Sequence, residues 1–124
     1  IYVADSETSS VRAINLKDES VETVVGRGLF VFADTDGRGD EVRLQHALGI
    51  AAQGDRLFIA DTYNNKIKVL DPKSKSCETF VGDIKSGSSD DPPRFDEPAG
   101  LSLSGNTLYV ADTNNHAIRV IDLD

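Results

Sequence analysis

The chain has 124 residues, of which 39% are hydrophobic, so its length suits one ordinary domain. Thirteen basic residues against 21 acidic ones give a formal net charge of -8, which opposes nonspecific attraction to nucleic-acid phosphates or anionic lipid. No apolar run approaches the roughly 18 residues of a membrane-spanning helix, so the sequence predicts no nucleic-acid partner and no membrane insertion.

One short phrase occurs three times and sets the expected fold. Tyr2–Ser6, Phe58–Thr62 and Tyr109–Thr113 each read aromatic residue, Val or Ile, Ala, Asp, Ser or Thr. The first two copies lie 56 residues apart (61 minus 5) and the last two lie 51 apart (112 minus 61). Repeats of this period, built from short strands, predict an all-β propeller of four-stranded antiparallel blades.

The chain covers only part of such a propeller, about two and a half blades. Ten strands are expected, at 1–4, 10–16, 21–25, 48–52, 56–60, 66–71, 76–81, 99–103, 107–111 and 117–121. They group into the last three strands of one blade (1–26), a long inter-blade loop (27–47), a complete blade (48–82), a second inter-blade loop (83–98) and the first three strands of the next blade (99–124). Because closed propellers need about four to eight blades, we expect the missing blades to come from the rest of a longer polypeptide.

The repeated phrase itself is interpreted as scaffold. Asp5, Asp61 and Asp112 end the second strand of each blade, where a carboxylate can accept backbone N–H bonds across a tight turn. Asn65 and Asn115 tolerate the left-handed conformation that such turns need. Calcium binding by these oxygen-rich turns is the alternative, but a feature present in every blade points to structure.

The first inter-blade loop departs from the repeat and is the predicted partner-facing segment. Asp34, Asp36 and Asp40 give it an acidic character, with Arg38 among them. The glycine and glutamate positions do not fit an EF-hand calcium loop, so a glycine-hinged acidic loop is favoured, with calcium left open. Tyr63 and His116, in the turns of the same face, complete the predicted surface, and His116 is placed at the position of Lys66.

Catalytic, metal and cofactor sites find no support in the sequence. The histidines lack a nucleophile elbow or a zinc-protease helix around them. The single cysteine, Cys77, lies in an apolar run and is expected to be a packed thiol, compatible with a reducing compartment. We therefore expect no catalytic residue, no metal ligand and no cofactor.

The segments Leu57–Asp71 and Pro98–Asp122 resemble NHL repeats. The long connection, with Leu29–Gly37 and Leu44–Gly49, is similar to the NHL region of the thioredoxin-NHL proteins. This resemblance implies a six-bladed propeller beside a thioredoxin-like domain, and any redox chemistry would belong to that domain, since Cys77 matches no thioredoxin motif. A cytoplasmic setting is favoured, with the chloroplast thylakoid lumen as the alternative that the resemblance implies.

The leading functional hypothesis is a noncatalytic propeller segment that presents its loops to a protein partner or to another domain of its own polypeptide. Two other classes stay open. One is an enzyme with a metal site in the central channel, completed by other blades, and the other is RNA binding by a basic loop face, which the acidic charge disfavours.

Overall fold

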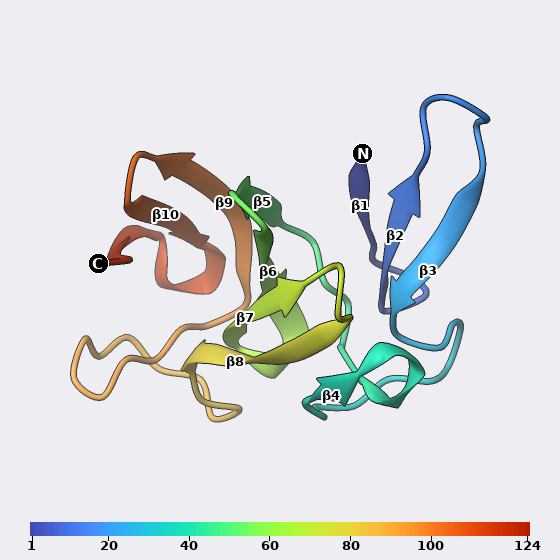
Figure 1. Cartoon of the computed structure of the whole chain (residues 1–124). Helices are drawn as coiled ribbons and strands as arrows, with labels where there is room; N and C mark the ends of the chain where they lie inside the picture. Colours follow the sequence, from blue (N-terminus) through green and yellow to red (C-terminus); the bar gives the residue numbers. More distant parts are fainter.

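The computed structural model describes all residues, 1–124, and contains three antiparallel sheets standing side by side (Figure 1). The chain is a partial β-propeller, as the repeat predicts. In chain order the strands are β1 (Tyr2–Asp5), β2 (Ser10–Ile14), β3 (Val21–Val25), β4 (Gly37–Arg38), β5 (Ile50–Gln53), β6 (Arg56–Asp61), β7 (Lys66–Asp71), β8 (Ser76–Gly82), β9 (Pro98–Ser104), β10 (Thr107–Asp112) and β11 (Ala117–Asp122).

The outer two sheets each have three strands, in the orders β1-β2-β3 and β11-β10-β9. The middle sheet has the order β4-β8-β7-β6-β5. Four of its strands form the expected blade, in which neighbours along the chain are neighbours in the sheet. The fifth, β4, comes from the first long connection and pairs with β8 at Gly37↔Cys77 and Arg38↔Ser76. β4 is not among the ten predicted strands, because a two-residue strand has no periodicity to detect.

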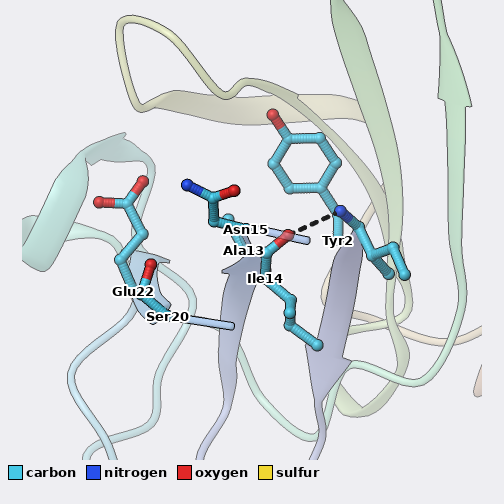
Figure 2. Close-up of a pocket in the computed structure, with 7 residues that line it drawn as sticks. Tyr2, Ala13, Ile14, Asn15, Ser20 and Glu22 are labelled. Atoms are coloured by element: carbon cyan, nitrogen blue, oxygen red, sulfur yellow. Dashed lines mark hydrogen bonds between the residues drawn. The ribbon is translucent and has the colours of Figure 1, made fainter. Parts of the chain in front are cut away.

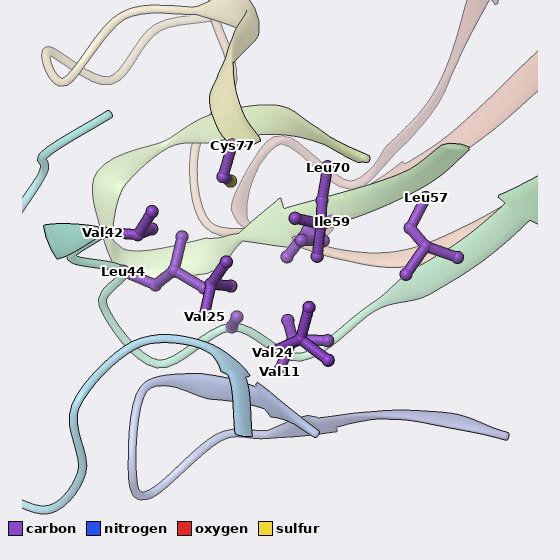
Figure 3. Close-up of a cluster of buried hydrophobic side chains, with 10 residues drawn as sticks. Val11, Val24, Val25, Val42, Leu44, Leu57, Ile59, Leu70 and Cys77 are labelled. Carbon is purple, nitrogen blue, oxygen red and sulfur yellow. The ribbon is translucent and has the colours of Figure 1, made fainter. Parts of the chain in front are cut away.

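Two hydrophobic clusters lie between the sheets, and β6 supplies both. Leu57 and Ile59 belong to the cluster between the first and middle sheets (Figure 3), whereas Phe58 and Ala60 belong to the cluster that contains Leu108 and Val110 of the third sheet. Side chains alternate across a strand, so an unbroken apolar run is what a strand buried on both faces requires.

Cys77 packs in the first of these clusters, 1% exposed. Burial raises the pKa of its thiol to about 12. The side chain is therefore a packed apolar group, as the sequence indicated.

Both long connections lie at one end of the sheets, together with the turns that follow the repeated aspartates (Figure 1). Those turns are short 3-10 helices, η2 (Thr62–Asn64) and η3 (Thr113–Asn115); a third, η1 (Gly39–Glu41), lies in the first connection. We call this end the long-connection face. It holds the candidate site.

None of the model's helices has the length and apolar character needed to cross a bilayer.

Candidate functional site

A buried carboxylate at the end of β6 joins the middle sheet to the first long connection. Asp61 is completely buried. Its Oδ1 accepts a hydrogen bond from the backbone N–H of Gln45 at 2.7 Å, and its Oδ2 accepts one from Asn64 Nδ2 at 2.8 Å. Gln45 lies 16 residues earlier, in the connection. The carboxylate thus holds the connection against the strand end.

The third sheet contains the same arrangement. Asp112 accepts hydrogen bonds from the backbone N–H of Asp96, again 16 residues earlier, and from Asn115 Nδ2, each at 2.8 Å. In the first sheet, Asp5 accepts a 2.7 Å bond from Arg12 Nε. The Asp61 and Asp112 carboxylates do not accept the predicted hydrogen bonds from the backbone N–H groups of their own turns. Asp61 and Asp112 instead accept backbone N–H bonds from the connection that precedes their sheet, at Gln45 and Asp96.

The asparagine positions also differ from the prediction. Asn65 is left-handed, with φ of 57°, but the left-handed residue of the third turn is His116, with φ of 52°. His116 is therefore the counterpart of Asn65 (116 minus 51) and not of Lys66. Asn115 instead donates from Nδ2 to Asp112 and to the Gly87 carbonyl oxygen at 2.8 Å.

Lys68 of β7 is the centre of an ion-pair network beneath the first connection. Its side chain is fully buried, and its Nζ lies 2.7 Å from Asp34 Oδ1, 2.7 Å from Asp36 Oδ1 and 3.7 Å from Asp61 Oδ2. Lys66 pairs with the other oxygen of Asp34. Burial opposes the charge on Lys68, but the hydrogen bonds to Asp34 and Asp36 raise its pKa.

The network corrects the predicted role of the acidic loop. Asp34 and Asp36 were expected to face a partner, yet their carboxylates bind Lys68, and Asp36 Oδ2 also accepts the Thr79 backbone N–H at 2.9 Å. Burial opposes their ionisation, but the hydrogen bonds from lysine hold the pKa of each below its ordinary value. Asp34 thus ties the first connection to β7, and Asp36, whose side chain stays 44% exposed, ties it to β7 and β8.

The other predicted surface residues lie in different places. Arg38 and Asp40 are exposed in β4 and η1, and His116 is exposed in the third sheet. Tyr63 is 48% exposed and stacks on His46, with ring centroids 4.6 Å apart. Of the six predicted residues, only Tyr63 joins the hollow described next.

A hollow of about 220 Å³ opens on the long-connection face between the first and middle sheets. Its lining comes from the β1–β2 turn, the first connection and η2, and consists of Glu7, Ser9, Leu29, Phe30, Phe32, Gln45, His46 and Tyr63. The three apolar side chains of the connection are 55%, 84% and 54% exposed in chain order. The hollow thus brings aromatic and apolar groups from three segments to one exposed place.

Phe30 is the most unusual member of this lining. Its φ is 63°, in the left-handed region, where a bulky residue is an outlier. The other seven non-glycine residues with positive φ fall at equivalent places in the repeat, in the sets Ser9, Asn65 and His116; Glu19 and Lys75; and His46 and Glu97. Phe30 has no such counterpart. The most exposed apolar side chain of the chain therefore sits on its one unrepeated left-handed residue other than glycine.

Leu29, Phe30 and Phe32 are not among the site residues predicted from the sequence. The signal was present: an apolar run inside a connection that is five residues longer than its counterpart (56 minus 51). The residues predicted instead are the neighbouring aspartates, which were chosen for their charge. Glu7 could not be predicted from a sequence motif, since only the fold places the β1–β2 turn beside the first connection.

A larger hollow, of about 400 Å³, lies at the opposite end of the first sheet (Figure 2). Strand residues and the β2–β3 turn line it, among them Tyr2, Asn15 and Glu22, and the Ile1 nitrogen donates a hydrogen bond to the Ile14 carbonyl oxygen at 3.0 Å. It gathers no cluster of charged or reactive groups. Nowhere in the chain do three His, Cys, Asp or Glu side chains lie close enough together to hold a metal ion.

Comparison with known proteins agrees with the repeat architecture of the chain. The family model for the NHL repeat matches residues 95–121. Residues 95–121 thus form an NHL repeat, and the chain as a whole resembles NHL-repeat proteins. Over its whole length it is 48% identical to NHL repeat-containing protein 2 of Bos taurus, and over 99% of its length it is 44% identical to Protein SUPPRESSOR OF QUENCHING 1, chloroplastic, of Arabidopsis thaliana. It spans 19% and 13% of those relatives.

Solved structures show the same fold at low identity. A protein of unknown function from Bacteroides thetaiotaomicron superimposes with a TM-score of 0.84 at 21% identity, covering 98% of this chain and 32% of that one. An auxiliary nutrient binding protein from the same organism gives 0.78 at 18%, covering 96% and 33%. The segment thus has the fold of about a third of each of these longer chains.

Proposed function

We propose that this NHL segment is a noncatalytic scaffold whose long-connection face binds a protein partner or another domain of its own polypeptide. The observation that carries the proposal is the exposed apolar lining of the hollow formed by Leu29, Phe30 and Phe32. Contiguous exposed apolar groups on a folded protein mark interaction sites. These residues lie in the connection that breaks the repeat.

The groups that could carry chemistry are already engaged in structure. Asp61 is surrounded by donors from Gln45, Asn64 and Lys68, and Cys77 is buried as a thiol. The His46 ring is held by Ser6 Oγ, 3.3 Å from its Nε2, and by the stacked ring of Tyr63. This supports a binding role over catalysis.

The alternatives make demands that this segment does not meet on its own. A central-channel metal enzyme needs convergent ligands, and an RNA-binding face needs a continuous Lys/Arg patch. Lys66 and Lys68, the cations nearest the first connection, are paired with Asp34 and Asp36. The proposed setting is a longer polypeptide of the thioredoxin-NHL type, in which the segment contributes part of a propeller.

Site-specific photo-crosslinking in the intact polypeptide tests the proposal. A crosslinking amino acid at position 29, in the hollow, is expected to capture a discrete protein or another domain of the same chain. The matched control is position 55, in the exposed β5–β6 turn at the opposite end of the blade. Equal capture from both positions, or none from position 29, contradicts an interaction role for this face.

A further inference from the structure

We infer that the hollow at Phe30 binds one apolar side chain of an extended protein segment, with a lysine or arginine beside it that pairs with Glu7. This inference rests on the proposed interaction role and specifies the chemistry of the partner. It comes from the size of the hollow, its charge and the conformation of its lining.

The size of the hollow suits a side chain. Pockets for drug-sized small molecules measure about 300–1,000 Å³, and this one measures about 220 Å³. Aromatic and aliphatic groups line its walls, as in the pockets that receive an anchor residue at the centre of a protein interface. One leucine, methionine or phenylalanine side chain is the expected occupant.

The charge of the hollow favours a basic residue next to that apolar side chain in the bound segment. Glu7 is its one charged lining residue; no lysine or arginine contributes to the lining. The Glu7 side chain is 80% exposed, and its nearest cationic group, if protonated, is His46 Nε2 at 3.8 Å. The net charge of -8 adds long-range attraction for a basic segment.

The same charge disfavours nucleobases as occupants. Sites for single-stranded nucleic acid combine stacking aromatics with a positive groove that follows the phosphates. Here Phe30, Phe32 and Tyr63 could stack on bases, but Glu7 would repel the backbone.

The backbone at Phe30 indicates that its exposure is imposed by the fold. Left-handed conformations of bulky residues persist only where the surrounding structure holds them, and they concentrate at ligand sites. The connection forms a turn there, with the Val31 N–H donating to the Gly28 carbonyl oxygen at 3.1 Å. The Phe30 side chain is thereby presented at the mouth of the hollow before a partner arrives, which reduces the ordering that binding would require.

The inference is tested by titrating the protein with three synthetic peptides while recording amide NMR shifts. The first has one leucine between two lysines in a Gly/Ser background, the second replaces the lysines with glutamates, and the third replaces the leucine with serine. We expect the first peptide to shift the amides of Glu7, Phe30 and His46, and the other two to bind about tenfold more weakly or worse.

Three variants localise the effect. Phe30→Gly suits the left-handed backbone and is expected to weaken the lysine peptide about tenfold. Glu7→Gln is expected to weaken it about threefold and to flatten its salt dependence. The matched control is Ile84→Ser, which removes a 59% exposed apolar side chain from the other long connection and is expected to change affinity less than about twofold.

Several outcomes overturn the inference. They are equal binding of the glutamate peptide, shifts that map outside the hollow, tighter binding of a single-stranded oligonucleotide or of free indole, and concentration-dependent shifts without peptide, which would indicate a second copy of this chain. If Phe30→Gly fails to fold, the Glu7→Gln result decides. Capture from position 29 in the crosslinking experiment, combined with failure of the lysine peptide, would leave the interaction role standing and reject only this partner chemistry.

Discussion

Lys68 shows how one residue type at one place in the repeat can fix a whole connection. Its counterparts in the other sheets are Arg12 (68 minus 56) and Arg119 (68 plus 51), and each pairs with the aspartate that ends the second strand of its own sheet. Arg119 also binds the second connection, through the Arg94 carbonyl oxygen at 2.8 Å and the Asp90 carboxylate. In the middle and third sheets this basic residue thus links the aspartate to the connection that precedes the sheet.

Reversing the charge of Asp34 is expected to destabilise the protein by about 3–5 kcal/mol, because it leaves the buried Lys68 beside a second cation. The measurement is chemical denaturation of Asp34→Lys. Asp40→Lys is the matched control: Asp40 is exposed, forms no ion pair, and should change stability by less than about 0.5 kcal/mol. Equal stability of the two variants would show that the network contributes nothing.

We expect Asp61 to make the free energy of unfolding depend on pH, with a sign opposite to that of an aspartate whose pKa is lowered by folding. Burial raises its pKa to about 6 from 3.8, against the hydrogen bonds from Gln45 and Asn64 and the charge of Lys68. The folded state then binds the proton more tightly than the unfolded state, so the contribution of Asp61 to stability falls as pH rises from about 4 to 6. The expected fall is about 1–3 kcal/mol, since one pKa unit corresponds to about 1.4 kcal/mol.

Denaturation of the wild type and of Asp61→Asn across this interval provides the measurement. Asparagine keeps an oxygen for the Gln45 N–H but has no proton to lose, so the variant should lack this component of the slope. Identical slopes in the two proteins would contradict the raised pKa. Asp34 and Asp36, whose pKa values are lowered, contribute stability that is lost only as pH falls below about 4, outside the interval.

Strands and turns differ in how well the sequence predicted them. The alternating and unbroken apolar patterns located the ten main strands, and the repeat offset paired Asp61 with Asp112. The first strand of the middle blade begins at Ile50 and not at Leu48. β4 and the hollow depend on which connection crosses which strand, and a local pattern does not contain that information.

Close packing between blades predicts a strong effect at Gly49. A methyl group added there would lie 2.0 Å from the Ala99 carbonyl oxygen, so Gly49→Ala should separate β5 from β9 and cost about 1–3 kcal/mol. Gly100 is its repeat counterpart, where an added methyl group meets only Ala111 Cβ at 3.4 Å. The melting temperature should therefore fall clearly for Gly49→Ala and little for Gly100→Ala. A similar change in both variants would contradict this account of the packing.

The molecule as a whole is a partial propeller, and its surfaces divide into those that the repeat explains and the hollow at Phe30, which it does not. Ile118, on β11, is 67% exposed, whereas its counterpart Ile67 (118 minus 51) is fully buried between the middle and third sheets. The exposed apolar face of the third sheet therefore has the character of an inter-blade surface, which a further blade would bury. The hollow at Phe30 has no such counterpart, and this separates it from the apolar surface that propeller packing explains.

The most direct test of the claim that the hollow at Phe30 is the interaction site is a crosslinking experiment in the intact polypeptide. It compares the yield from position 29 between the wild type and Phe30→Gly. Phe30 is 84% exposed and left-handed, so glycine should leave the melting temperature unchanged or slightly higher. The account predicts a crosslink in the wild type that drops at least about fivefold in the variant at equal melting temperature. An undiminished crosslink in a folded Phe30→Gly protein would contradict it.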